Sequence, residues 1–309
     1  MLSRMEDSTH IEREPRTALV FGGSGQIGER LVANLLSQGW AVTAVSRQPR
    51  TSVAGEAWLV ADLFGAWQGP ARFDVVFSCG PLDHFARWFA STSLECPRIV
   101  AFGSTSMEVK QDSIEPAERA VAQRMRQAET TLFVAASERG VAATLLRPTL
   151  IYGAGRDKTL TVIADIARRR GFCVLPFAAN GLRQPVHVQD LADAAMQVVA
   201  RPETFGKGYA LGGGETLPYT TMVRRVLDAL RPRPRLLRVP TSLFRWALHR
   251  AHAKGRLQGM SDATLARMCE PLAFDTAPAR RDFGYAPRPF MVDAAMLGLA
   301  DAPAGEASP

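Results

Sequence analysis

The chain has 309 residues, of which 47% are hydrophobic, and it carries a formal net charge of +7. This length fits one large α/β domain with a smaller second lobe, and the chain lacks a run of about 18 apolar residues that would span a bilayer. Residues 1–16 are polar and lack the apolar core of a secretory signal, so we expect a flexible leader and a cytoplasmic protein. The four cysteines form no CxxC pair and no zinc-like cluster with histidine, so we expect reduced thiols and no metal site.

Arginine supplies most of the positive charge. Such a balance is compatible with nucleic acid, anionic lipid or a phosphorylated substrate as partner. Because arginine preference also follows genome composition, we expect a small anionic molecule as partner and no nucleic acid.

Strand-like and helix-like patterns alternate through the first half of the chain. This alternation predicts crossover units, and hence a doubly wound parallel sheet of the Rossmann type with helices on both faces and a ligand over the carboxyl ends of the strands. The predicted strands are 18–21, 41–45, 57–60, 74–77, 99–102 and 142–146, and the predicted helices are 26–38 and 116–139.

The pattern loosens after residue 148, where Arg147-Pro148 ends the sixth predicted strand. We therefore expect a leader over 1–16, a dinucleotide-binding domain over 17–150, a C-terminal substrate lobe over 151–300 interleaved with the last strands of the main domain, and a disordered tail over 301–309. Within the lobe the predicted elements are helices 160–170 and 190–200, a short strand 185–188 and a mainly helical stretch 217–268, in which the arginine–proline run 231–235 is a connector.

A glycine loop joins the first predicted strand to the first predicted helix. Gly22 permits a tight turn, Gly25 lets the backbone approach a pyrophosphate, and Gly28 lets the helix pack on the sheet. The helix N-terminus adds free N–H groups and the positive end of its dipole. We expect this loop to bind a dinucleotide through Gly22, Gly23, Ser24, Gly25, Gln26, Ile27 and Gly28.

The end of the second predicted strand selects between the two nicotinamide cofactors. NAD-binding proteins usually place Asp or Glu there, whereas this chain has Arg47, with Arg50 close by. Because a guanidinium fork suits a 2′-phosphate, NADP(H) is favoured over NAD(H), although Arg47 also fits an exposed charge after a strand. Asp62, followed by Leu63, is a candidate for the adenine edge and equally for a helix N-cap.

The turn after the fourth predicted strand lies at the expected nicotinamide end of the site. Cys79 and Gly80 are therefore candidate cofactor contacts. His84 follows shortly after them and is a candidate substrate contact, with a residue on the surface of a helix as the alternative.

Several short motifs occur together along the chain. They are Gly22–Gly28, Ala61-Asp62-Leu63, Ser104-Thr105-Ser106, Leu146-Arg147-Pro148 with Ile151-Tyr152-Gly153, Gly181–Val188 with Asp190-Leu191-Ala192, Phe274-Asp275 and 282–288. In this set the chain resembles the extended short-chain dehydrogenase/reductase superfamily, in its NAD-dependent epimerase/dehydratase branch, over about residues 17–290. The resemblance implies a nicotinamide cofactor, a nucleotide sugar or similar anionic substrate, and a possible homodimer through the helix over 116–139.

The resemblance also implies roles for individual residues. Ser104 and Thr105 match the hydroxyls that hydrogen-bond the reacting oxygen, although they also fit the capping of a strand end. Arg183 matches an arginine that contacts substrate phosphate, and Tyr152 matches a tyrosine that shapes the pocket wall. His187 lies in the same segment as Arg183 and is a substrate candidate, with a satisfied core histidine as the alternative.

The Tyr-x-x-x-Lys pair of that superfamily has no counterpart in the expected helix. Val121 and Met125 occupy the two positions, and residues 107–148 contain no tyrosine and one lysine, Lys110. The tyrosine exchanges a proton with the substrate oxygen and the lysine lowers the pKa of that tyrosine; general acid–base catalysis is typically worth about 10²–10⁴-fold. Tyr152 and His84 are candidate replacement acids. The active site is therefore expected to be atypical.

The leading hypothesis is an NAD(P)-binding epimerase/dehydratase-like or reductase-like oxidoreductase, and the alternative is a redox-silent NADP(H)-binding regulatory or assembly protein. The basic amphipathic stretch 242–256 is expected to cover the substrate lobe, with Leu243, Phe244, Trp246 and Leu248 facing inward. Contact of this stretch with an anionic membrane, together with a lipid-like substrate, is the less favoured interpretation.

Overall fold

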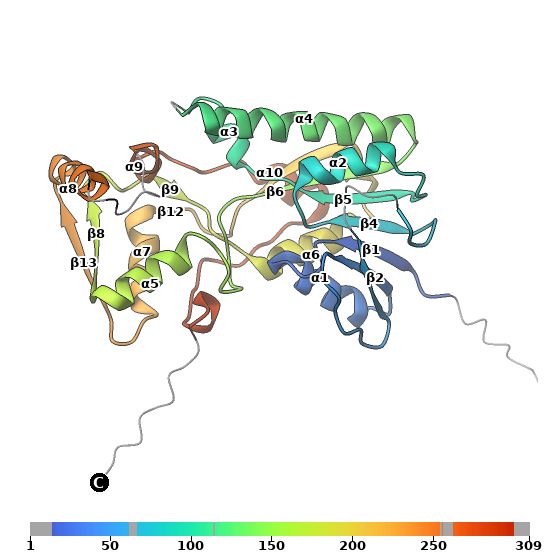
Figure 1. The fold of residues 1–309 in the computed structure, drawn as a ribbon, viewed down its shortest axis with the longest axis horizontal. Helices are drawn as coiled ribbons and strands as arrows, with labels where there is room; N and C mark the ends of the chain where they lie inside the picture. The colour runs from blue at the N-terminus through green and yellow to red at the C-terminus, as the bar shows by residue number, and fades with distance from the viewer. Residues whose placement is uncertain (1–13, 62–66, 114, 254, 256–261, 300–309) are drawn as a thin grey trace, which may run out of the picture.

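The computed structural model describes residues 14–61, 67–113, 115–253, 255 and 262–299. Its main sheet has seven parallel strands in the order β11-β6-β5-β4-β1-β2-β3 (Figure 1). Because β4 lies on one side of β1 and β2 on the other, the sheet has its topological switch point at the carboxyl end of β1. The strands are β1 (Thr17–Phe21), β2 (Ala41–Ser46), β3 (Glu56–Val60), β4 (Val75–Ser78), β5 (Arg98–Phe102), β6 (Ala142–Pro148) and β11 (Lys207–Leu211).

The predicted Rossmann-type sheet is confirmed, and the six predicted strands are present with bounds that shift by one or two residues. The sequence pattern misses the seventh strand, β11. Its sequence, Lys-Gly-Tyr-Ala-Leu, contains glycine and lacks a continuous apolar run, because β11 lies at the edge of the sheet and pairs only with β6.

Helices cover both faces of the main sheet. Successive residues of a strand point to opposite faces, so Ala18 and Val20 of β1 belong to one core and Leu19 and Phe21 to the other. Figure 1 shows α1 and α6 below the sheet and α2 and α4 above it. These helices are α1 (Gln26–Ser37), α2 (Leu82–Ser91), α4 (Pro116–Glu138) and α6 (Val188–Val198).

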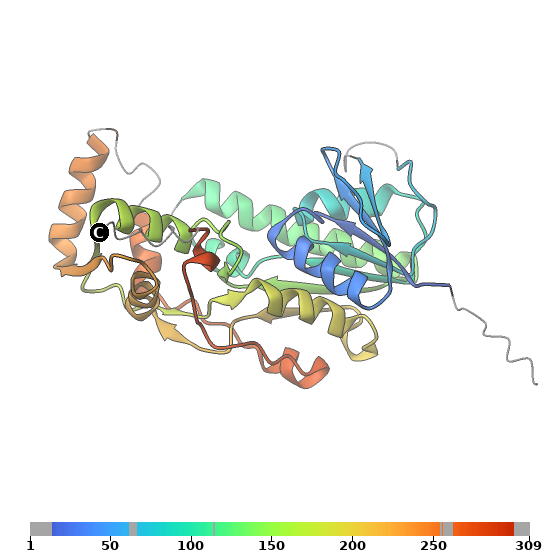
Figure 2. The ribbon, with the colours of Figure 1, turned by 90° about the horizontal axis from the view of Figure 1, so that it is seen from below.

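A second lobe lies at one end of the molecule (Figure 2) and has a core of its own that includes Tyr152, Met222 and Phe290. The stretch 217–268, predicted to be mainly helical, also contains two strands, and residues 231–234 connect α7 to β13. The lobe contains β7 (Ile151–Tyr152), α5 (Leu160–Arg170), β8 (Phe172–Pro176), β9 (Leu182–Arg183), β10 (Val186–His187), β12 (Leu217–Pro218), α7 (Tyr219–Asp228), β13 (Arg235–Val239), α8 (Thr241–Ala253) and α9 (Asp262–Cys269).

Helix α8 differs from the sequence-based expectation. Leu248 is buried and Phe244 is half-buried, but the side chains of Leu243 and Trp246 are 49% and 58% exposed. The prediction that all four face inward is therefore wrong for Leu243 and Trp246. The reason is that α8 lies at the outer end of the lobe and packs along one side against β8. Within the described part of the chain, no helix is long and apolar enough to cross a bilayer.

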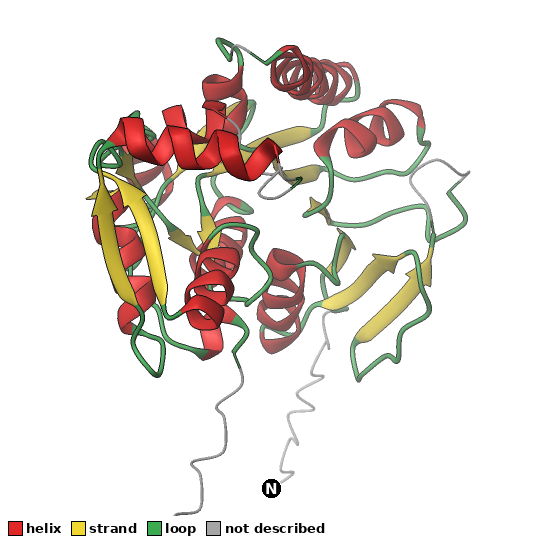
Figure 3. Cartoon of the chain, turned by 60° about the vertical axis from the view of Figure 1, so that its left-hand side comes forward, coloured by secondary structure: helices red, strands yellow, loops and turns green. Residues whose placement is uncertain are grey.

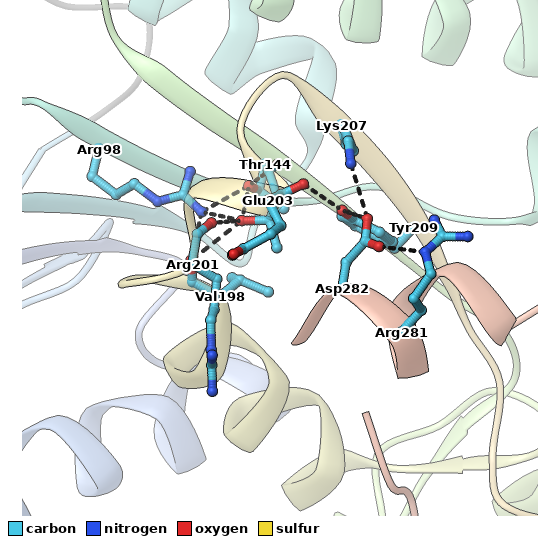
Figure 4. Close-up of polar contacts among 10 residues, drawn as sticks. Arg98, Thr144, Val198, Arg201, Glu203, Lys207, Tyr209, Arg281 and Asp282 are labelled. Carbon is cyan, nitrogen blue, oxygen red and sulfur yellow. Dashed lines mark hydrogen bonds and ion pairs between the residues drawn. The ribbon is translucent and has the colours of Figure 1, made fainter. Parts of the chain in front are cut away.

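A buried arginine connects α6 to the main sheet (Figure 4). Arg98, 4% exposed, donates to the carbonyls of Val198 and Val199 at the end of α6, at 2.8 and 3.2 Å. It also donates to the hydroxyls of Thr144 and Thr204, at 2.7 and 3.1 Å. Burial lowers the pKa of Arg98 to about 10, so the side chain is still charged at neutral pH. The negative end of the α6 dipole partly compensates that charge.

A second polar cluster fastens the C-terminal helix α10 (Ala277–Phe283) to β11 (Figure 4). The carboxylate of Asp282 accepts bonds from Tyr209 at 2.8 Å, Lys207 at 3.0 Å and Arg281 at 2.8 Å. The bond from Arg281 is the largest reason that the pKa of Asp282 lies well below its usual range. The edge strand that the sequence pattern misses is thus held by a side chain of α10, a helix that follows it by more than 60 residues.

Candidate functional site

The glycine loop turns from β1 into α1 at the switch point of the sheet. Gly22 has φ +71°, and a Cβ there would lie 2.9 Å from backbone atoms of Cys79 and Gly80. A Cβ on Gly28 would lie 2.1 Å from the carbonyl oxygen of Gly22. Only glycine fits these two positions, so the loop, the end of β4 and the first turn of α1 approach one another as a nucleotide-binding loop requires.

The first turn of α1 is accessible to an anion. Within the described residues no side chain caps this helix at Gly25, whose own N–H bonds to the Gly22 carbonyl at 2.9 Å. Two buried atoms at this edge, Gln26 Oε1 and Ser78 Oγ, have no hydrogen-bond partner within the described part of the chain. The uncapped helix end and these two unsatisfied atoms fit the phosphates and neighbouring polar groups of a nicotinamide dinucleotide.

Two arginines follow β2, where Rossmann folds contact the adenosine ribose. Arg47 and Arg50 are both exposed, and residues 46–50 contain no carboxylate. The guanidinium of Arg50 lies 5.3 Å from the ring centre of Trp58 on β3. The same ring flanks the glycine loop, since a Cβ on Gly23 would be 3.4 Å from it. The ribose end is therefore bordered by two cations and an indole ring.

Arg156, in the loop after β7, reaches the nucleotide loop from a distant part of the sequence. Its guanidinium pairs with Glu29 at 2.6 Å and donates to the carbonyl of Ser24 at 3.2 Å. Arg156 lies 127 and 132 positions from these partners, so sequence periodicity gives no signal for the contact. It connects the loop after β7 to the first turn of α1.

A cavity of about 400 Å³ lies where the carboxyl ends of β5 and β6 meet the second lobe. Of the residues predicted to contact substrate or reacting atoms, Ser104, Thr105 and Arg183 line it. Its apolar lining comes from both parts of the molecule: Leu150, Met222, Met268, Leu272 and Phe274.

One wall of the cavity carries linked hydroxyls. Ser104 Oγ donates to Ser106 Oγ at 2.9 Å and accepts from the Ser106 N–H at 3.1 Å. Ser106 Oγ in turn lies 4.0 Å from Met125 Sδ of α4. Thr105 is buried and donates to the Pro148 carbonyl at 3.2 Å. Ser104 and Ser106 thus line the cavity as a hydrogen-bonded pair, whereas the Thr105 hydroxyl holds the loop against β6.

The opposite wall is cationic. Arg183, 6% exposed, donates to the carbonyls of Leu182 at 2.6 Å and Glu270 at 3.0 Å, and also to that of Arg267. Burial lowers its pKa. These bonds hold the end of α9, so part of the guanidinium predicted to contact an anion already serves the lobe. Arg267 lines the same cavity and pairs with Glu118 of α4 at 2.7 Å.

Lys110 and Tyr219 are among the lining residues that the sequence motifs do not predict. Lys110 ends the short helix α3 (Ser106–Lys110) and lines the cavity beside the hydroxyls. Tyr219 lies beneath Arg183, with 5.2 Å between ring centre and guanidinium carbon, and burial raises its pKa to about 12. The resemblance predicts a Tyr-Lys pair within α4, but the lysine that lines the cavity lies on α3 and the tyrosine lies on α7.

Three predicted substrate residues lie outside this cavity. Tyr152 is 1% exposed in the lobe core, where its hydroxyl accepts from the Met291 N–H at 3.4 Å. His187 is the N-cap of α6, and its Nδ1 accepts from the Gln189 N–H at 3.1 Å. His84 lies on the surface of α2, between α2 and α4. The structure thus gives Tyr152 and His187 packing and capping positions instead of contact with the cavity.

Two further predicted residues, Asp62 and Leu63, lie outside the described residues. Cys79 continues the β1–β4 pairing through its N–H, which bonds to the Phe21 carbonyl at 2.8 Å, and burial raises the pKa of its thiol to about 12. The Cys79 thiol is therefore neutral and packs as an apolar group. Among the described residues, no group of three or more His, Cys, Asp or Glu side chains is arranged to hold a metal.

The fold and this geometry define an α/β protein of the Rossmann type whose glycine loop fits a dinucleotide and adjoins a cavity. Residues 18–91 match the family model of the NAD dependent epimerase/dehydratase family. The match covers the segment from β1 to α2.

Curated relatives and solved structures agree with this assignment of fold. A 2-alkyl-3-oxoalkanoate reductase of Stenotrophomonas maltophilia (strain K279a) is 25% identical, over 87% of this chain and 94% of the relative. An epimerase of Methanothermobacter thermautotrophicus superposes with a TM-score of 0.66 at 15% identity, covering 89% of this chain and 88% of that one. MoeE5 in complex with UDP-glucose and NAD gives 0.64 at 17% identity, covering 91% and 96%.

Proposed function

We propose that the protein is an NADP(H)-dependent oxidoreductase that acts on the carbonyl or hydroxyl carbon of an anionic metabolite. One observation carries the proposal: the hydroxyls of Ser104 and Ser106 and the cations Lys110, Arg183 and Arg267 line one cavity at the edge of the sheet that holds the glycine loop. When bound, the cofactor would supply or accept a hydride. Gly22, Gly25 and Gly28 would hold its pyrophosphate.

The residues that line the cavity support separate roles in the reaction. Ser104, hydrogen-bonded to Ser106, would donate to the reacting oxygen. As the carbonyl carbon is reduced, the Ser104 hydroxyl would turn from Ser106 to the reacting oxygen and give up its proton. Ser106 would return a proton to Ser104, and Lys110 would return one to Ser106. This assigns the missing acid to α3, because Val121 and Met125 of α4 have no transferable proton.

The lining supports an anion with an apolar body. Lys110 and Arg267 line the cavity as cations, while Leu150, Met268 and Phe274 offer apolar surface. The similar reductase is named for 2-alkyl-3-oxoalkanoates, which combine a carboxylate with apolar chains, and MoeE5 binds UDP-glucose. Both classes of anion, 3-oxo acids and nucleotide sugars, therefore belong in the first substrate screen.

Removal of the proposed acid is expected to lower turnover. Lys110→Met should reduce kcat by about 10²-fold and Ser104→Ala by about tenfold or more, since general acid catalysis contributes about 10²–10⁴-fold. The oxidation of NADPH with each candidate substrate measures this. Lys207→Met, which removes a lysine on β11 away from the cavity, is the control and should retain full activity. Undiminished turnover in Lys110→Met would refute the role of Lys110.

The preference for NADP(H) rests on Arg47 and is separately testable. Arg47→Ala should weaken NADPH binding by about tenfold or more and leave NADH binding unchanged, because a charge-assisted bond to phosphate is worth about 1.5–3 kcal/mol. Calorimetric titration of both nucleotides measures this, with Arg72→Ala, an exposed arginine before β4, as the control. An equal loss for NADH and NADPH would show that Arg47 does not recognise the 2′-phosphate.

The second candidate function is a redox-silent NADP(H)-binding regulatory or assembly protein. It is favoured by the contact between Ser106 Oγ and Met125 Sδ, which puts a thioether on the face of α4 that looks toward the cavity hydroxyls. Tight cofactor binding combined with no turnover of any substrate in the screen would favour this function over the oxidoreductase.

We also propose that the protein is cytoplasmic and forms a dimer through α4. A hydrodynamic mass of one chain would refute the dimer.

A further inference from the structure

The positive charge of the protein is concentrated in one part of the second lobe. Residues 160–176 and 219–253, which form α5, β8, α7, β13 and α8, contain eleven arginines and two aspartates, a formal charge of +9. The whole chain carries +7, so the remaining residues together carry −2. The basic character of this protein is therefore a local property of the lobe and not of the nucleotide-binding domain.

The same part of the lobe exposes large apolar side chains. Trp246 is 58% exposed, Phe177 52%, Leu243 49%, Leu237 44% and Phe172 38%. Leu243 and Trp246 are three residues apart on α8 and so share one side of that helix. Phe172 and Leu237 point to the same face of the β8–β13 pair, because Phe172 pairs with Arg235 and Leu237 lies two residues further along the strand. We call these five residues, with the arginines among them, the distal face.

The distal face occupies the end of the molecule farthest from the main sheet. Figure 1 places α8, β8 and β13 together there, and Figure 3 brings this end forward. α8 follows β13 directly, since the N–H of Phe244 bonds to the Pro240 carbonyl at 3.0 Å. The Phe177 N–H likewise bonds to the Val239 carbonyl at 2.8 Å, so Phe177 lies where β13 leads into α8.

Arginines lie directly on the exposed aromatic rings of this face. The guanidinium of Arg250 is 5.3 Å from the ring centre of Trp246, and that of Arg238 is 5.6 Å from the ring centre of Phe177. Beside them is a groove of about 460 Å³ between α7 and β13, lined by Arg224, Arg233, Arg235 and Arg238, with Asp228 as its acidic residue. Cations that surround and overlie apolar side chains match the boundary between lipid headgroups and acyl chains.

We infer that the distal face docks on an anionic phospholipid bilayer. Leu243 and Trp246 enter the headgroup boundary, and the surrounding arginines contact lipid phosphates. A second copy of the chain is disfavoured as the occupant, because it would bring the exposed arginines of one distal face, such as Arg238 and Arg250, against those of another. A nucleic acid would use the arginines and the aromatic rings but has no use for the exposed leucines.

The distal face belongs to the lobe that also forms part of the cavity. α8 precedes α9 in the chain, and α9 contributes Arg267 and Met268 to the cavity. The inference itself does not depend on the proposed oxidoreductase activity, since it rests on charge and exposure alone.

Vesicle co-sedimentation of the full-length protein tests the inference. Binding to phosphatidylcholine vesicles that contain phosphatidylglycerol should exceed binding to pure phosphatidylcholine by at least about tenfold, and added salt should weaken it. The double variant L243S/W246S should lose at least about tenfold of that binding, as should R245E/R250E. V53S, which removes an exposed valine before β3, should bind like the wild type.

The inference would be wrong if the wild-type protein stayed in the supernatant with anionic vesicles. It would also be wrong if either double variant sedimented like the wild type. A smaller hydrodynamic mass of L243S/W246S would identify the face as an interface between copies, and binding of single-stranded RNA that displaces vesicles would identify it as a nucleic-acid surface. Circular dichroism of each variant, together with its NADPH binding, separates loss of docking from loss of fold.

Discussion

Gly28→Ala is expected to abolish dinucleotide binding, although alanine is the better helix former. In an ordinary helix position the change would stabilise the protein by about 1 kcal/mol. At residue 28 the new Cβ would lie 2.1 Å from the Gly22 carbonyl oxygen and 2.7 Å from Gly23 Cα. Both are backbone atoms that cannot rotate away, so α1 must move from β1 and the loop must open. We expect NADPH affinity to fall at least about 100-fold, or 2.7 kcal/mol.

A control on the same helix separates this loss from a change in stability. Ala33 is exposed on α1, and Ala33→Gly should cost about 1 kcal/mol of unfolding free energy through helix propensity alone. Its NADPH affinity should equal that of the wild type. Thermal unfolding with and without NADPH measures both quantities. A Gly28→Ala protein that binds NADPH normally would show that the loop does not hold the cofactor.

Arg98→Met is expected to lower the free energy of unfolding strongly. The substitution removes the Arg98 donor from the carbonyls of Val198 and Val199 and from the hydroxyls of Thr144 and Thr204. The Val198 carbonyl still accepts from the Arg201 N–H at 3.2 Å, and the two hydroxyls still bond to one another at 3.1 Å, so the buried cluster loses part of its hydrogen bonding. Each buried polar group left unpaired costs about 1–3 kcal/mol, partly offset because a buried charge is also removed. We expect a net loss of roughly 3 kcal/mol in unfolding free energy, measured by urea denaturation.

Two further variants test the cause of that loss. Arg98→Lys keeps the charge but offers three donors in place of the planar fork, so it should be less destabilising than Arg98→Met. Arg126 is exposed on α4, and Arg126→Met should change the unfolding free energy by less than about 0.5 kcal/mol. If Arg98→Met proved as stable as Arg126→Met, the hydrogen bonds to α6 would contribute nothing net.

The nucleotide-binding half of the fold is predictable from the sequence because its signals are local. Each central strand is a short apolar run, and the glycines lie where a strand turns into a helix, so spacing alone identifies them. β11 escapes this reasoning, since an edge strand needs little hydrophobicity and its place is fixed by pairing with β6 and by Asp282. The strands β8 and β13 are missed for a similar reason, because many of their residues are exposed or only half-buried.

The cavity is only partly predictable, because its walls come from segments far apart in the chain. Ser104, Thr105 and Arg183 follow from the motifs, and all three line it. Lys110 and Tyr219 have no motif, and only the fold shows that they reach the same space. Tyr152 and His187 are in the expected motifs, yet packing against Phe290 and capping of α6 account for them.

The proposed activity depends most on the binding of a nicotinamide dinucleotide by Gly22–Gly28 and the first turn of α1. Isothermal titration calorimetry of the wild-type protein with NADP⁺, NADPH, NAD⁺ and NADH tests it directly. We predict one site per chain that binds at least one of the four nucleotides, with the phosphorylated forms bound more tightly. The absence of binding by all four would contradict the assignment of this loop, and the proposed oxidoreductase with it.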